Sequence, residues 1–220
     1  MKKGFYSEGE IKVDKYIRET YFPNYDYKGV IVEVGAATPE FISMSKHFND
    51  NDWRAIMIEP NPTFAKQHRE LGNEIIECAC SYENEDDVNF VLMHAGSDSS
   101  NQNVISDHSF SSLSLKDSFV DFFNDRSWVN SIKRTNIKVK QRTLDTLIIE
   151  NNIPKIDILT VDVEGWEIEV MKGLSTIQPT LVVLEHIGDI NAKECNKHME
   201  DFGYVMDKQL EHNYIYILKK

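Results

Sequence analysis

VIVEVGAATP, residues 30–39, decides the fold class of this chain, because its apolar first half forms a strand that runs directly into Gly35 and a turn. A second apolar strand, Ala55 to Ile58, ends on Glu59. In parallel α/β folds an acidic residue at the end of the second strand binds ribose hydroxyls. Glu33 inside the first strand and Glu59 after the second therefore point to a nucleoside-containing ligand.

The turn after the first strand indicates which ligand to expect. A dinucleotide needs close backbone approach to a pyrophosphate and hence the pattern G-x-G-x-x-G, whereas residues 35–39 keep only the first glycine. A cofactor with a ribose and no phosphate fits this turn better. S-adenosylmethionine is the common cofactor of that kind.

The bulk composition limits the class of protein. With 220 residues, 41% of them hydrophobic, and no apolar run of about 18 residues, the chain is expected to form one soluble domain without a membrane span. The start of the sequence lacks a secretory signal and the three cysteines agree with a reducing compartment, so we expect a cytoplasmic protein. The formal net charge of −12 argues against nucleic acid as a partner, because a phosphate backbone is bound by clustered Lys and Arg. No feature indicates an oligomeric state.

The order of apolar segments predicts a β-α-β-α arrangement. Residues 1–28 are expected to form an N-terminal helical lead-in and residues 29–220 a single domain. Thr38-Pro39 and Asn61-Pro62 each place a capping residue before a proline, which predicts a helix start after each of the first two strands. Two strands near the C-terminus are joined too closely for a parallel crossover, so they form an antiparallel pair. A polar stretch is expected as an inserted loop at about residues 94–127, either a functional lid or a disordered excursion.

Acidic residues gather where the predicted strands end: Glu33, Glu59, Asp162, Glu164 and Glu185. In open α/β sheets ligands bind outside the carboxyl ends of the strands. Asp162 and Glu164 flank a valine, so in extended geometry they face the same side, where close carboxylates raise one another's proton affinity. Such a pair suits a general base that takes a proton from a hydroxyl. The competing interpretation is that Glu164 caps the following helix.

His186 directly follows Glu185 at the end of another buried strand. A histidine beside a carboxylate at this edge is a candidate base or substrate contact, and a plain surface histidine is the alternative. A metal site built from Asp162, Glu164, Glu185 and His186 is a less favoured hypothesis, and no metal is predicted.

These segments together resemble the FkbM-type family of S-adenosylmethionine-dependent methyltransferases. The resemblance covers roughly residues 30 to 186 and depends on four ordered segments: VIVEVGA at 30–36, IEPNP at 58–62, RTLD at 142–145 and, above all, DVEGWE at 162–167 with Gly173 behind it.

The resemblance implies a class I methyltransferase fold, a Rossmann-like α/β domain with a seven-stranded, mostly parallel sheet and an antiparallel last hairpin. It also implies O-methylation of a sugar or natural-product hydroxyl, with a small-molecule acceptor as partner. By the same resemblance, the amino-acid end of the cofactor would contact Glu33, Gly35 and Ala36, its ribose side Glu59, Pro60 and Asn61, and its adenine Cys80 and Ser81. Ser111 and Ser112 match a serine motif of the family and would lie near the substrate.

Two positions depart from the family pattern and keep other functions open. The family tends to have asparagine where this chain has Ala37, and glycine where it has Pro39. One alternative is an NAD-dependent sugar oxidoreductase on a related fold, although the single glycine of the turn and the absence of an evident Tyr-x-x-x-Lys pair count against it. The other alternative is a non-catalytic binding module that retains the fold.

Overall fold

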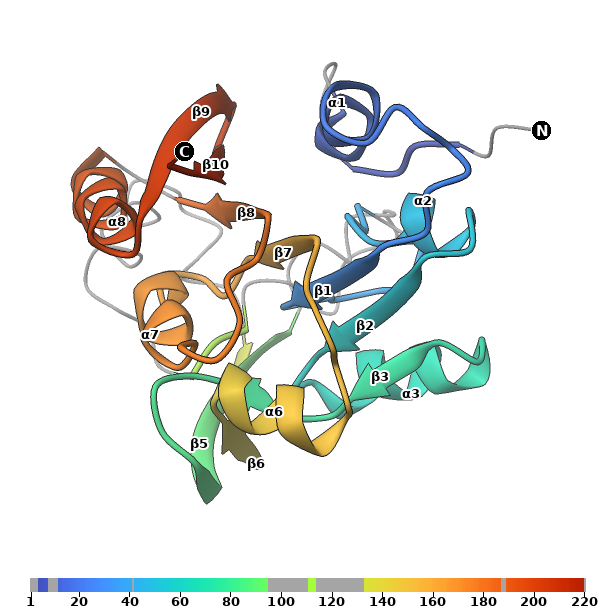
Figure 1. The fold of residues 1–220 in the computed structure, drawn as a ribbon. Coiled ribbons are helices and arrows are strands. Elements are labelled where there is room, and N and C mark those ends of the chain that lie inside the picture. The colour runs from blue at the N-terminus through green and yellow to red at the C-terminus, as the bar shows by residue number, and fades with distance from the viewer. Residues whose placement is uncertain are drawn as a thin grey trace.

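A seven-stranded sheet forms the centre of the molecule (Figure 1). The computed structural model describes residues 4–7, 12–40, 42–94, 111–113, 133–186 and 189–219. In the sheet order β3-β2-β1-β7-β8-β10-β9, the strands are β3 (Glu74–Ile76), β2 (Arg54–Ile58), β1 (Val30–Val34), β7 (Ile158–Val161), β8 (Leu181–Glu185), β10 (Asn213–Leu218) and β9 (Tyr204–Leu210). The first five are parallel, and β10 is antiparallel to both β8 and β9. The predicted fold class is confirmed.

Helices cover both faces of this sheet: α1 (Val13–Thr20), α2 (Lys46–Asn49), α3 (Pro62–Glu70), α6 (Leu144–Glu150), α7 (Glu167–Lys172) and α8 (Asp189–Asp201). Successive side chains of a strand point to opposite faces, which divides the core in two. On one face Val32 belongs to a cluster with residues of α6, α7 and α8; on the other Ile31 belongs to a cluster with residues of α1 and α2. Figure 1 shows the two groups of helices on opposite sides of the strands.

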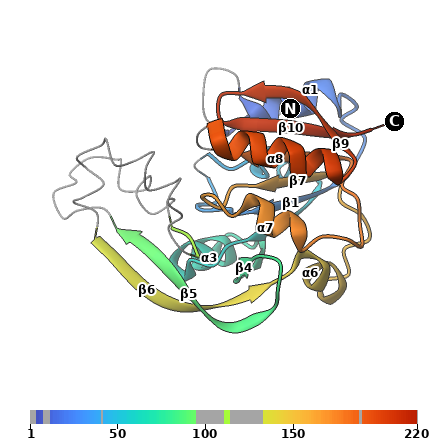
Figure 2. The ribbon, with the colours of Figure 1, turned by 90° about the vertical axis from the view of Figure 1, so that its left-hand side faces the viewer.

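A two-stranded ribbon extends from the body (Figure 2). It consists of β5 (Glu85–His94) and β6 (Lys133–Arg142), and β6 also pairs with the short β4 (Ala79–Cys80). Most of the loop predicted at about 94–127 lies outside the described residues. Its described part, 111–113, pairs with β5: Val91 N donates to Ser112 O (2.8 Å), and Ser112 N donates to Val91 O (3.2 Å).

The helix predicted to start at Thr38-Pro39 is wrong. The described residues between β1 and α2 form bends, and the first helix after β1 is the single turn α2. Ala37 (φ 44°) and Ile42 (φ 53°) adopt left-handed backbone conformations that interrupt a helix. The loop instead wraps around the buried carboxylate of Glu33, a tertiary interaction that local capping signals do not contain.

The N-terminal segment folds back onto the body. α1 lies within the predicted lead-in. Two contacts hold the segment before it: the backbone N–H of Tyr6 donates to Asp14 (2.6 Å), and the ring of Phe5 stacks on His47 with centroids 4.2 Å apart. These contacts bring Ser7 close to the carboxyl ends of the strands. Within the described ranges, no helix combines the length and apolar character needed to cross a membrane.

Candidate active site

A cavity of about 370 Å³ lies at the carboxyl ends of β1, β2, β7 and β8. Its size falls within the range of small-molecule sites, roughly 300–1,000 Å³. The acidic residues of its lining are Glu33, Glu59, Asp162, Glu164, Glu185 and Glu211, and no Lys or Arg is found among the described residues that line it. This composition favours a ligand with positive charge.

Gly35 lets two strand ends meet beneath this cavity. It adopts φ +82°, and a Cβ placed on it would lie 1.8 Å from the carbonyl oxygen of Asp162. The N–H groups of Gly35 and Ala36 both donate to Ile58 O, at 2.9 and 3.3 Å. Only glycine fits this position, because the backbone after β7 occupies the space of a side chain.

Glu33 holds the loop that borders the cavity. Its carboxylate accepts hydrogen bonds from Met44 N (2.7 Å), Ser45 N (3.2 Å), the Ser43 hydroxyl (3.2 Å) and the Ser45 hydroxyl. Burial raises the pKa of Glu33, and these hydrogen bonds oppose the rise. The observed role of Glu33 is therefore to order residues 43–45, although it also lines the cavity.

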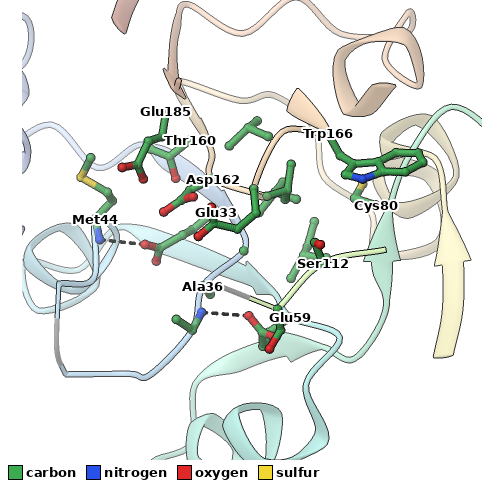
Figure 3. Close-up of a pocket in the computed structure, with 18 of the residues that line it drawn as sticks. Glu33, Ala36, Met44, Glu59, Cys80, Ser112, Thr160, Asp162, Trp166 and Glu185 are labelled. Carbon is green, nitrogen blue, oxygen red and sulfur yellow. Dashed lines mark hydrogen bonds between the residues drawn. The ribbon is translucent and has the colours of Figure 1, made fainter. Parts of the chain in front are cut away.

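Glu59 lines the cavity directly after β2 (Figure 3). One carboxylate oxygen accepts from Ala37 N (2.9 Å) and the other from Asn61 N (2.7 Å). The carbonyl of Ala37 in turn accepts from His68 Nε2 (3.1 Å), so this left-handed residue is held from both sides. Burial raises the pKa of Glu59 to about 7. Pro60 lines the cavity, whereas Asn61 caps α3 by accepting from Thr63 N (3.0 Å).

Asp162 and Glu185 lie together at the adjoining ends of β7 and β8. The parallel register pairs Val161 with Leu184, so the next residues along both strands are neighbours on one face of the sheet. Figure 3 shows both carboxyl groups beside Thr160, the side chain two residues before Asp162. The side chain of Asp162 is exposed to the cavity, which limits the desolvation of its carboxyl group. Its pKa is nevertheless raised, first by burial among protein atoms and then by the negative charge of Glu185.

The turn that follows Asp162 has an unusual backbone. Glu164 (φ 56°) and Gly165 (φ 95°) are consecutive left-handed residues. Glu167 stabilises the turn by accepting from Val163 N (3.3 Å) and Gly165 N (3.0 Å). Glu164 is 8% exposed and lines the cavity, and one of its carboxylate oxygens is buried without a hydrogen-bond partner among the described residues. Strained non-glycine residues of this kind cluster at functional sites.

Apolar side chains form another part of the lining. They are Phe64 from α3, Cys80 from β4, Phe90 from β5 and Trp166 before α7, together with the polar Ser112 at the edge of β5. Figure 3 shows Trp166, Cys80 and Ser112 on one side of the cavity, and Asp162 and Glu185 on the other. The cavity thus places two carboxyl groups across from the apolar Trp166 and Cys80.

Comparison with known proteins agrees with this geometry. A family model described as the methyltransferase FkbM domain matches residues 33–216. The chain belongs to the FkbM methyltransferase family. The crystal structure of methyltransferase FkbM from Methylobacillus flagellatus KT is similar, with 13% sequence identity and a TM-score of 0.49 over 93% of this chain and 50% of that one. The chain therefore spans about half the length of that protein. A comparison with curated proteins gives no match.

Most of the residues predicted from the sequence line the cavity: Glu33, Gly35, Ala36, Glu59, Pro60, Cys80, Ser111, Ser112, Asp162 and Glu164. Asn61, Ser81 and His186 do not belong to the lining. Ser81 is fully buried, and its N–H donates to Arg142 O (3.0 Å).

His186 is buried behind the cavity. Its Nε2 lies 3.3 Å from the Tyr216 hydroxyl, which itself donates to Asn196, so the histidine donates and Nε2 carries the proton. Burial lowers the pKa of His186 to about 4. The ring is therefore neutral near pH 7 and packs against Tyr214, with centroids 4.9 Å apart.

Other residues in or beside this cavity were not predicted. Phe64 and Phe90 gave no functional signal, because apolar side chains on a helix and a strand are normally core residues. An acid in the first turn of a helix is normally exposed, whereas Glu167 is 2% exposed and holds the turn before α7. Its position two residues after Gly165 was the available signal. No cluster of three or more metal-binding side chains occurs in the described part of the chain.

Proposed function

We propose that this protein is an S-adenosylmethionine-dependent O-methyltransferase that acts on a hydroxyl of a sugar or natural-product small molecule. The observation that carries the proposal is the position of Glu59, fixed at the end of β2 in a cavity whose lining also contains apolar side chains and other carboxylates. Carboxylates at this position bind ribose hydroxyls in related α/β folds. If the ribose bound at Glu59, the adenine of the cofactor would lie on one side of Glu59 and its charged amino-acid end on the other.

The two ends of the cavity suit the two ends of that cofactor. Phe64, Cys80 and Trp166 offer the flat apolar surface that an adenine requires. Gly35 and Ala36 lie below the opposite end, where Glu33 orders the neighbouring loop. The buried oxygens of Thr160 and Glu164 that lack partners are also suited to a ligand in this cavity. The donor set therefore fits the cofactor, which supplies an electrophilic methyl group on a positively charged sulfur.

Asp162 is the proposed base. Its carboxyl group opens to the cavity at the acidic end, and its raised pKa suits a group that takes a proton from a hydroxyl near neutral pH. Glu164 lines the same region and would support Asp162. We assign His186 no direct contact with the acceptor, because it lies outside the lining and its Nε2 bonds to Tyr216.

Alignment of the acceptor hydroxyl is the main proposed contribution of the cavity, since positioning lowers the barrier of a bimolecular transfer. Ser111 and Ser112 line the cavity from the edge of β5 and are the proposed acceptor contacts. Ser7 reaches the cavity from the N-terminal segment and is a further candidate. A dinucleotide fits this site less well, because the described lining offers neither Lys nor Arg to a pyrophosphate.

The proposal is tested by calorimetric titration with S-adenosylmethionine, S-adenosylhomocysteine and NADH. We expect both adenosyl ligands to bind and Glu59→Ala to weaken them by at least about tenfold, which corresponds to about 1.4 kcal/mol. Glu77→Ala is the matched control, because Glu77 is exposed and pairs with Arg69 (2.7 Å) on the surface, outside the cavity lining. NADH binding alone would favour the oxidoreductase. Binding of the adenosyl ligands without methyl transfer to a panel of sugar and natural-product alcohols would favour the binding module.

A further inference from the structure

The side chains of Thr160, Asp162 and Glu185 lie together at the acidic end of the cavity. Thr160 pairs with Glu33 in the register of β7 and β1, and Asp162 and Glu185 follow at the ends of β7 and β8 on the same face. All of them line the cavity. Asp162 and Glu185 come from adjacent parallel strands, so the rigid sheet holds the two carboxyl groups together.

The register of β7 and β8 places the carboxyl groups of Asp162 and Glu185 side by side in the cavity lining, within hydrogen-bonding reach of each other. Ionised carboxylates are only acceptors, so a hydrogen bond between two carboxyl groups requires a proton on one of them. One proton held between two adjacent carboxyl groups would remove the repulsion between their charges.

The described side chains around this pair are mostly acidic. Glu33 faces it from β1, Glu164 and Glu167 from the turn and α7, and Glu211 and His212 from the turn between β9 and β10. The N-terminal segment contributes the uncharged Ser7 to the lining. Because no Lys or Arg belongs to the described lining, a bound cation is the means by which both carboxylates become charged.

We propose that Asp162 and Glu185 act as one carboxyl pair, which holds a single shared proton in the empty site, releases it when the sulfonium cofactor binds, and takes the proton of the acceptor hydroxyl during methyl transfer. This inference rests on the proposed function. It makes Glu185 a positioning residue for Asp162 and for the positive charge of the cofactor.

The transfer step balances in charge and atoms. A bond forms between the acceptor oxygen and the methyl carbon, and the bond from that carbon to sulfur breaks, with its electron pair left on sulfur. The hydroxyl proton passes to Asp162, so the doubly charged pair becomes singly charged as the sulfonium becomes a neutral thioether. The pair thus returns to its one-proton state as the product forms, and the site then holds the neutral thioether less strongly than the sulfonium.

The test is a count of protons released on ligand binding. Titrations at pH 7 in two buffers with different ionisation enthalpies measure proton release from the buffer dependence of the binding heat. We expect wild-type protein to release about one proton per bound S-adenosylmethionine and clearly less per S-adenosylhomocysteine. In Glu185→Gln, an amide adds no charge and donates to Asp162, so proton release with S-adenosylmethionine should fall close to zero. Glu150→Gln, an exposed position on α6, is the control and should match the wild type.

The outcomes separate this inference from the proposed function. Two outcomes would overturn the shared proton and leave the methyltransferase assignment intact. In the first, wild-type protein binds S-adenosylmethionine without releasing a proton. In the second, wild-type protein and Glu185→Gln release equal numbers of protons. Absence of S-adenosylmethionine binding would refute both. If Glu185→Gln fails to fold, as judged by circular dichroism, the wild-type comparison of the two ligands still decides.

Discussion

Replacing Gly35 by alanine tests the close contact on which the cavity is built. The new Cβ would lie 1.8 Å from the carbonyl oxygen of Asp162, whereas ordinary contact begins near 3.4 Å, so the ends of β1 and β7 must separate by roughly 1.5 Å. This movement would break the hydrogen bond from Asp162 N to Val34 O (3.0 Å).

The cost of Gly35→Ala can be worked from its parts. A left-handed conformation (φ +82°) costs an alanine about 1 kcal/mol, loss of the buried hydrogen bond about 1 kcal/mol, and forced displacement of packed backbone about 2 kcal/mol. We therefore expect the free energy of unfolding to fall by about 4 kcal/mol. A domain of ordinary stability, about 5–15 kcal/mol, would still fold, so the change is measurable.

Urea denaturation followed by circular dichroism measures this loss, and Gly72→Ala is the matched control. Gly72 has nearly the same backbone conformation, φ +75°, and an added Cβ meets nothing within 4 Å. It should cost only about 1 kcal/mol. A Gly35→Ala protein whose unfolding free energy lies within 1 kcal/mol of that of Gly72→Ala would refute the close-contact explanation. In folded Gly35→Ala protein, cofactor affinity should fall as well, whereas Gly72→Ala should bind normally.

Three other perturbations have expected outcomes. Thr160→Val removes a buried hydroxyl that has no hydrogen-bond partner among the described residues, so urea denaturation should show the unliganded protein about 1 kcal/mol more stable. Calorimetry should show weaker cofactor binding by the same variant. Unchanged stability would mean that the hydroxyl has a hydrogen-bond partner in the unliganded protein. The pKa of Glu59 is raised from 4.5 to about 7, so its contribution to stability is complete below pH 4.5 and is lost as pH rises through 7. Glu59→Gln should therefore gain about 3 kcal/mol relative to wild type between pH 4.5 and pH 8 in urea denaturation, and an equal difference at both pH values would contradict this. Burial raises the pKa of Cys78 to about 12 and that of Cys80 well above its usual range. Alkylation of these two thiols at pH 7, followed by mass spectrometry, should therefore be far slower in the native than in the unfolded protein.

The strand framework could be predicted because its signals are local. The apolar runs that became β1, β2, β7 and β8 are short and end on acids or glycine, and the close final strands require antiparallel pairing. Since parallel strands bring their carboxyl ends to one edge, the grouping of Glu59, Asp162 and Glu185 followed from the same pattern.

The features that the sequence did not reveal depend on contacts between distant segments. Thr38-Pro39 has good helix-start chemistry, yet Glu33 captures the amides of residues 44 and 45 and imposes a bent loop. Glu167 looks like an ordinary acid of a first helical turn until the fold buries it against the turn before α7. Whether His186 faces the cavity or the core depends on Tyr216, which follows 30 residues later.

Two carboxylates at this site hold the backbone, and one of them, Glu59, also lines the cavity. Glu59 binds the N–H of left-handed Ala37, and Glu167 binds the N–H groups around left-handed Glu164. Buried negative charges and strained backbone both destabilise the empty protein. A cationic ligand that neutralises these carboxylates would relieve part of that cost, so ligand binding and loop order must stabilise each other. The stability of this acidic site should therefore depend on the positively charged ligand that it is proposed to bind.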